Sequence, residues 1–442
     1  MKKKQKQLLD LAESLVSYGR KKGADEVQVR VSDGSDFSVD VREGKIEKLE
    51  EASERDLSLK VIVDQKTASA TSSDLTKETL HHLVDNGIAR ARVSSADPFA
   101  GLPEKEEVQV KAEDLRIYDP KIIELSPEKK IEAAKQTEAI CLTEKRVRKS
   151  HGAGFGTYHG TLALANSNGF SGVYDRTSCS CGVYLQSGEG DNLFDDGWDD
   201  FSRNLDDLLS PEAIAQKAVH RVTRLIGARK IETQKVPVVL EPYMTGSILR
   251  FLYDCVKGSN IYMKRSFLVD KLGETVGNEH INVIDNGLIP GGPSSKPFDR
   301  EGVPVRKTVV FEKGVLKSYL LDTYSARKLN LKSTGNRAGA NNLYLESGND
   351  TPEAIIKSVD KGLLLVDTIG QGEETTSGDI SKGAFGLWIE NGELVYPVAE
   401  ITISGNLGEM LKQIEMVGND LEFKRSITGP TIKISEMTIG GK

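Results

Sequence analysis

The 442-residue chain has few cysteines and no long apolar run. Four cysteines are too few for the disulfide framework of a protein this long, so we expect a reducing, cytoplasmic compartment. No stretch approaches the roughly 20 apolar residues that span a bilayer, so no membrane span is expected. The basic start, Met1 to Gln7, runs into a mixed segment, which is typical of an amphipathic helix rather than a signal peptide.

Excess positive charge is also missing. The formal net charge is -7 and the pI is about 5.6, which disfavours broad binding to phosphate backbones. We therefore expect no direct contact with nucleic acid. Charged residues make up 28% and hydrophobic residues 38%, as in globular proteins, and the length predicts two or three domains.

The first hundred residues alternate between two periodicities. A helical pattern covers residues 4–22 and returns over 74–92. Between them, apolar residues recur at every second position, which indicates strands, with Asp33-Gly34 and Glu43-Gly44 as turn signals. We interpret residues 1–97 as an N-terminal α+β domain of two layers, and the Pro- and Gly-containing segment 98–117 as a linker.

A second α+β domain is predicted over residues 118–228. A hydroxyl residue precedes Pro-Glu at three places along the chain: Ser126, Ser210 and Thr351. This pattern is typical of a helix start, in which the hydroxyl caps the helix and Pro occupies its first position. Strand patterns lie near 145–150, 157–166 and 171–186, and Asn166-Ser167-Asn168-Gly169 indicates a hairpin turn.

The remaining residues, 229–442, predict a large β-rich C-terminal domain. Short Gly-rich strands dominate it, and helices are expected near 245–256, 322–329 and 352–361. The overall fold class is therefore α+β, with two-layer helix and sheet domains first and the β-rich domain last.

Several motifs in the second half occur in one order. They are Ser266 to Gly273, Gly291-Gly292, Asp299 to Val303, Gly314 to Leu329, Gly386 to Glu393 and Tyr396 to Leu407. In this order they resemble the TldD/PmbA family. The resemblance implies the family's C-terminal fold and a relation to metallopeptidases.

The resemblance also implies that a zinc site has been lost. TldD-type members carry His-Glu-x-x-x-His, which falls here on Arg250, Phe251 and Cys255. A guanidinium repels a metal, a benzyl ring neither ligates nor accepts a proton, and one thiolate is not a site. Residues 417–442 also lack the Cys that serves TldD-type chains as a further ligand. The chain thus resembles the PmbA (TldE) branch, so we expect no catalytic residue and no cofactor, with zinc held only by a TldD-type partner.

Four other groups of residues invite a functional reading. Cys179 and Cys181, with His151 and His159, could form a metal or redox site, although small buried cysteines on a strand are the commoner outcome. Cys255 with His280 could form a nucleophile and base, but no spacing rule connects them.

The run Gly152 to Gly156 lacks the Lys-Ser/Thr of a phosphate loop. The acidic segment Asp191 to Asp200, which carries Trp198, predicts a solvated loop or a docking loop for a partner.

Glycines could shape a peptide cleft. Loops containing Gly291, Gly292, Gly370, Gly372 and Gly378 would let the backbone of a substrate strand approach closely, although tight turns explain them as well. Arg250 could bind a carboxylate, either a peptide C-terminus or an acidic group of a partner.

Three functions remain open. The first is the non-catalytic subunit of a TldD-type zinc protease that acts on extended or unfolded peptides, in which this chain forms a hetero-oligomer with a TldD-type paralogue, or a homodimer. The second is an independent hydrolase with an unrecognised site. The third is a protein-interaction module that modulates DNA gyrase, as names in the family suggest.

Overall fold

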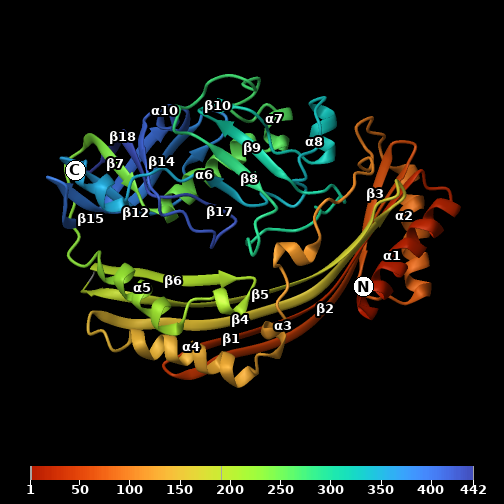
Figure 1. Ribbon diagram of the computed structural model, residues 1–442, viewed down its shortest axis with the longest axis horizontal. Helices are drawn as coiled ribbons and strands as arrows, with labels where there is room; N and C mark the ends of the chain where they lie inside the picture. Colours follow the sequence, from red (N-terminus) through yellow and green to blue (C-terminus); the bar gives the residue numbers. More distant parts are fainter. Residues whose placement is uncertain (1, 191, 442) are drawn as a thin grey trace.

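A long curved sheet partly encloses the C-terminal half of the chain (Figure 1). The computed structural model describes residues 2–190 and 192–441. The sheet has six strands in the order β3-β2-β1-β4-β5-β6, and β1 pairs with both β2 and β4. Its strands are β1 (Glu26–Arg42), β2 (Lys45–Val63), β3 (Lys66–Ser72), β4 (Val147–Asn166), β5 (Ser171–Glu189) and β6 (Asn192–Ser202).

These strands are longer than the sequence predicts. β1 runs straight through Asp33-Gly34, so the turn predicted there is wrong, whereas Glu43-Gly44 does form the β1–β2 turn with φ of 51° and 71°. Gly34 is small because a Cβ would lie 2.8 Å from the hydroxyl of Tyr158, on the neighbouring strand. The predicted strands near 145–150 and 157–166 are likewise one strand, and the predicted β4–β5 hairpin at Asn166 to Gly169 is confirmed.

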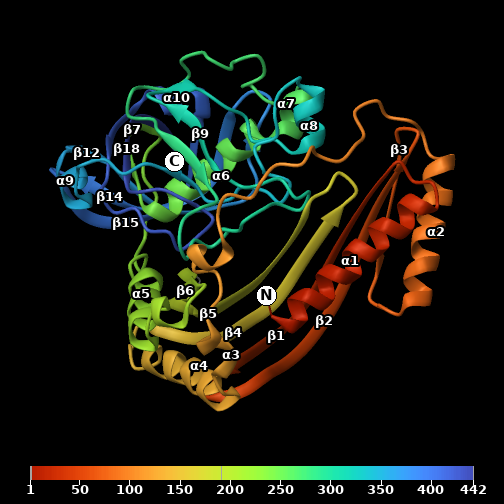
Figure 2. The ribbon, with the colours of Figure 1, turned by 45° about the vertical axis from the view of Figure 1, so that its right-hand side comes forward.

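Helices cover the outer face of the sheet at both of its ends (Figure 2). Odd-numbered residues of β1 face them: Val27, Val29 and Val31 share a core with α1 and α2, and Phe37, Val39 and Val41 share one with α4 and α5. Because β1 is continuous, one alternation of side chains serves both cores. The helices are α1 (Lys3–Lys21), α2 (Lys77–Val93), α3 (Pro120–Glu124), α4 (Pro127–Cys141) and α5 (Pro211–Thr223).

The predicted helix starts are present, each with Pro in the first turn. Ser210 and Thr351 cap their helices by accepting the amides of Ala213 and Ala354, whereas Ser126 makes no side-chain cap bond.

The C-terminal half packs two further sheets around one core. A five-stranded sheet has the order β10-β9-β8-β11-β17, and a seven-stranded sheet has the order β12-β7-β18-β15-β14-β13, with β16 paired to β18. Side chains of both sheets and of α6 share the core, which confirms the predicted α+β class with a β-rich C-terminal part. The elements are β7 (Gln234–Leu240), α6 (Pro242–Val256), α7 (Gly258–Tyr262), β8 (Val283–Asn286), β9 (Lys307–Glu312), β10 (Val315–Leu316), α8 (Thr323–Lys328), β11 (Leu343–Leu345), α9 (Pro352–Lys357), β12 (Lys361–Ile369), β13 (Glu373–Glu374), β14 (Asp379–Glu390), β15 (Glu393–Asn406), α10 (Leu407–Lys412), β16 (Ile414–Val417), β17 (Ile427–Thr428) and β18 (Ile432–Gly440).

The segment predicted as a linker, residues 98–117, is packed rather than free. Leu102 and Leu115 are each 1% exposed, and Arg327 of α8 donates to the carbonyls of Phe99 and Leu102. The two predicted N-terminal domains, on either side of this segment, contribute strands to a single sheet.

Two neighbouring ion pairs join the sheet to the C-terminal half, and they differ in burial. Lys424 Nζ lies 3.0 Å from Asp200 Oδ2, and the Asp200 side chain is 0% exposed. Arg425 lies 2.8 Å from Asp199, with both side chains about half exposed. The same connection therefore contains one buried and one solvated pair.

We predict that Lys424→Met lowers the free energy of unfolding by about 2 kcal/mol, because among the described residues it leaves the buried Asp200 carboxylate with only the amide of Leu209 as donor. Arg425→Met, the matched control, should cost at most about 1 kcal/mol because its pair is solvated. Urea denaturation followed by tryptophan fluorescence measures both. Equal losses would show that burial of Asp200 does not matter.

Candidate functional site

Helix α6 carries the three degenerate motif positions on two different faces. Successive helical residues are rotated by about 100°. Phe251 and Cys255, 2% and 0% exposed, therefore lie together in the core, while Arg250 is exposed. Arg250 makes no hydrogen bond or ion pair with any residue that the structure describes. The N-terminus of α6 is held by Arg224, which binds the carboxylate of Glu241 in a bidentate pair at 2.5 and 3.0 Å.

The inner face of α6 offers hydrophobic packing rather than metal ligands. Burial raises the pKa of the Cys255 thiol to about 12, which keeps it protonated at neutral pH. Within residues 2–190 and 192–441, no three His, Cys, Asp or Glu side chains are grouped so that they could hold a metal ion. The residues present at the motif positions therefore do not fit a zinc ion.

The outer face of α6 lies near the hairpin that contains three of the predicted cleft glycines. Burial raises the pKa of Asp254, and the charge of Glu373 on β13 raises it further, against the opposing effect of Lys257 and Arg250. Phe267 donates its amide to the carbonyl of Thr375 at 2.9 Å, which fixes the turn after β13 against the segment that follows α7. The charge effect of Glu373 on Asp254 indicates that β13 lies on the side of α6 that carries Asp254.

The five cleft glycines fall in two separate places. Gly370, Gly372 and Gly378 belong to the connection from β12 to β14, and Gly291 and Gly292 to the loop between β8 and β9. Gly291, Gly370 and Gly378 have φ of 72°, 85° and 84°, which favour glycine, so tight turns account for them. None of the five lines either of the two cavities described below. A role in peptide binding stays a prediction.

The cysteine and histidine candidates do not converge. Cys179 and Cys181 share the buried, helix-facing side of β5, where Cys181 Sγ lies 3.5 Å from the hydroxyl of Thr137. His151 is instead bonded to Asp195, with 2.6 Å between Nε2 and Oδ1. Cys255 is buried and His280 exposed. The run Gly152 to Gly156 lies inside β4 and forms no phosphate loop.

The acidic segment is an edge strand, so the predicted loop is wrong. Asp191 lies outside the described residues; the other four aspartates all lie on β6 and are individually paired. Asp195 binds His151, Asp196 binds Arg221 of α5, Asp199 binds Arg425 and Asp200 binds Lys424. Their partners lie 25 to 226 positions away in the sequence, which is why the segment resembles a solvated loop when it is considered alone.

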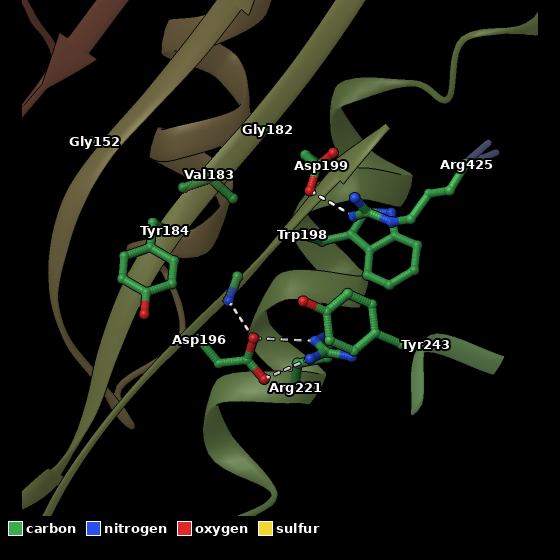
Figure 3. A pocket seen from close by; sticks show the side chains of 11 residues that line it. Gly152, Gly182, Val183, Tyr184, Asp196, Trp198, Asp199, Arg221, Tyr243 and Arg425 are labelled. Atoms are coloured by element: carbon green, nitrogen blue, oxygen red, sulfur yellow. Dashed lines mark hydrogen bonds and ion pairs between the residues drawn. The ribbon is translucent and has the colours of Figure 1, made fainter. Parts of the chain in front are cut away.

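A cavity of about 360 Å³ lies beside this edge strand (Figure 3). Tyr184, Trp198 and Tyr243 give it aromatic walls, and Arg221 lies 5.2 Å from the ring centroid of Tyr243. The Arg221–Asp196 and Arg425–Asp199 pairs neutralise the charges at its border. Its volume is in the range of small-molecule sites, and its walls suit an apolar or aromatic group. Sequence reasoning found Trp198 but missed Arg221, Tyr243 and Arg425, which come from separate elements and carry no motif.

Comparison with known proteins identifies the family. Sequence models of the PmbA/TldA metallopeptidase match residues 27–91 (domain 1), 120–226 (central domain) and 233–441 (C-terminal domain). "Metalloprotease PmbA" of Escherichia coli O157:H7 is 33% identical over 420 residues, 95% of this chain and 93% of that protein. The chain therefore belongs to the PmbA/TldD metallopeptidase family.

Two further similarities add detail. A crystal structure of a Bacteroides thetaiotaomicron protein, proposed to be a modulator of DNA gyrase, superposes with a TM-score of 0.92 at 29% identity and covers 98% of each chain. "Metalloprotease TldD homolog" of Buchnera aphidicola is 32% identical over 201 residues, 40% of this chain and 42% of that protein. Among the described residues, no helix is both long and apolar enough to cross a membrane.

We predict that Cys255 resists alkylation by iodoacetamide at pH 8 in the native protein, because burial holds its thiol pKa near 12. Mass spectrometry should find it labelled only after denaturation. Leu331→Cys, at a position 40% exposed, provides a reactive control in the same chain. Native labelling of Cys255 at the rate of that control would contradict the burial on which our account of α6 depends.

Proposed function

We propose that this chain is the subunit without a metal centre in a two-component peptidase, and that a TldD-type paralogue supplies the zinc site. The observation that carries the proposal is the filling of the motif positions on α6: Phe251 and Cys255 pack in the core and Arg250 projects from the surface. Membership of a metallopeptidase family and the similarity to a TldD homologue support it.

In this arrangement the chain binds and positions peptide. The exposed face of α6 and the β13 edge of the seven-stranded sheet would form part of the wall of a shared cleft. A free strand edge pairs with extended backbone whatever its side chains are, which suits unfolded peptides as substrates. Arg250, exposed and unpaired within the described chain, is available for an acidic group of the partner or of the peptide.

A second candidate is a protein-interaction role on DNA gyrase, and it is favoured by the similarity to the Bacteroides protein proposed as a gyrase modulator. The net charge of -7 directs such a role to gyrase itself rather than to its DNA. An assay of gyrase supercoiling with and without the chain separates the two candidates, because a peptidase subunit alone should leave supercoiling unchanged.

We predict that the purified chain neither retains stoichiometric zinc nor cleaves an unfolded substrate such as casein, since α6 provides no converging ligands. Mixing with a TldD-type paralogue should produce cleavage that a chelator abolishes. Elemental analysis and gel-based cleavage assays measure both. Chelator-sensitive cleavage by the chain alone would refute the proposal, as would failure of every paralogue from the same cell to bind it.

We predict that Arg250→Glu leaves folding stability within about 0.5 kcal/mol, because the side chain is exposed and unpaired within the described chain. The association rate with the paralogue, or the KM for peptide, should worsen several-fold, and more strongly at low salt. Surface plasmon resonance and steady-state kinetics report the two effects. Lys332→Glu reverses an exposed charge elsewhere and is the control. If the two variants behave alike, Arg250 has no special role.

A further inference from the structure

A second cavity, of about 200 Å³, lies between the inner face of the long sheet and the C-terminal half. We call it the cationic cavity because five of its lining side chains are basic. They come from distant parts of the chain: Arg30 on β1, Arg176 on β5, Arg203 just after β6, and Lys296 and Arg300 in the loop between β8 and β9. The residues lining it from the sheet's strands are all even-numbered, on the face opposite to the helices.

Arg30 is ion-paired with Asp56 at 3.2 Å, but two of the other basic groups are incompletely satisfied by the protein. Arg176 donates to the hydroxyl of Tyr158 at 3.2 Å, and Arg203 donates to the carbonyls of Thr177 and Pro293. The Nε atoms of Arg176 and Arg203 are buried, and neither has a hydrogen-bond acceptor among the described residues. Unpaired buried donors are costly, so they indicate an acceptor that comes from elsewhere.

The carboxylate in the lining does not neutralise these cations. Asp299 is 2% exposed, and its oxygens accept the backbone amides of Glu301, Val303 and Arg337. No ion pair within 4.0 Å joins it to a basic side chain in the described chain. Lys296 Nζ likewise donates to a carbonyl, that of Ser294, at 3.1 Å.

Electrostatics agree with this excess of positive charge. Burial, reinforced by Arg176, lowers the pKa of Arg203 to about 10. Burial also lowers the pKa of Lys296 to about 8, against the opposing effect of Asp285 and Asp299. A bound anion would stabilise the charged forms of Arg203 and Lys296. Those charged forms would in turn strengthen the binding of the anion.

The lining also contains apolar side chains, which are interspersed with the basic ones. They are Leu162, Tyr174, Phe298, Ala338 and Ala340, and the rings of Tyr174 and Phe298 pack edge to face at 5.2 Å. A site whose lining combines cations and hydrocarbon favours an anion that carries an apolar group. The volume is below the roughly 300 Å³ at which sites for larger small molecules begin, so it suits a single residue.

We propose that the cationic cavity binds the C-terminal residue of a peptide, with the carboxylate against the arginines and the side chain against Phe298 and Tyr174. The inference rests on the proposed function, because it gives one end of the peptide a place within this chain. Free phosphate shares the oxyanion chemistry but lacks the apolar part.

Binding of three probes to the isolated chain tests the proposal by calorimetry: acetyl-Ala-Ala-Phe with a free carboxylate, the same peptide as its C-terminal amide, and inorganic phosphate. We expect the free acid to bind at least about tenfold more tightly than the amide, since charge-assisted hydrogen bonds are lost with the carboxylate. We also expect it to bind more tightly than phosphate. Equal affinity of acid and amide, tighter binding of phosphate, or binding of no probe would each overturn the proposal.

Variants locate the site. Arg300 is exposed, so Arg300→Gln should keep the fold and weaken binding of the free acid about fivefold. Arg203→Lys keeps the charge but loses the planar fork, and should weaken it further if the variant folds. Arg90→Gln, at an exposed position on α2, is the matched control and should change nothing. Unchanged binding in Arg300→Gln would overturn the proposal. These binding measurements use the isolated chain without zinc or a partner. A failure of the cavity to bind the peptide is therefore distinguishable from a failure of the chain and its paralogue to form a peptidase.

Discussion

The alternation of side chains along unusually long strands is the constraint on which the rest of the structure depends. β1 and β5 have 17 and 19 residues, and their odd-numbered side chains face the helices; β4, with 20 residues, keeps the same alternation from Ala153 onward, after two bulges near its start. A slip by one residue would exchange the two faces. It would turn Val29 towards the C-terminal half and Arg30 into the helical core. The hydrophobic cores under α1, α2, α4 and α5 therefore also fix the position of the cationic cavity, although none of their residues touches it.

The sequence predicted the features that depend on neighbouring residues. Helical periodicity located α1 and α2, and Pro-Glu after a hydroxyl residue located the starts of α4, α5 and α9. The turn at Glu43-Gly44 followed from residues that adopt positive φ. The same reasoning failed at Asp33-Gly34, because there the glycine makes room for Tyr158 on another strand. It failed again at β6, whose four described aspartates are paired with residues up to 226 positions away. Long-range partners decided both cases, and a local pattern does not contain them.

The motif positions on α6 and the cationic cavity also differ in whether their residues are neighbours in the sequence. The altered positions on α6 could be interpreted from sequence, since ligands on one helix keep a fixed spacing and the chemistry of Arg250, Phe251 and Cys255 is evident. The cationic cavity could not be found, because Arg30, Arg176, Arg203 and Lys296 are single basic residues in four unrelated segments. The fifth basic residue, Arg300, lies inside a recognisable motif, the run from Asp299 to Val303, and Lys296 lies close to it. Pairing across the sheet and docking of the β8–β9 loop bring the four together.

The burial of α6 shows how the positions of the metal motif are filled in this chain. A zinc site needs polar ligands that converge on a water-accessible position, which interrupts the hydrophobic core around it. Here Phe251 and Cys255 continue the core instead, so apolar contacts hold the inner face of the helix. Restoring two imidazoles and a carboxylate at these positions would bury polar groups among hydrocarbon without the remaining ligand, which is unfavourable. The inner face of α6 is therefore committed to stability, and only its outer face, with Arg250, is left for recognition.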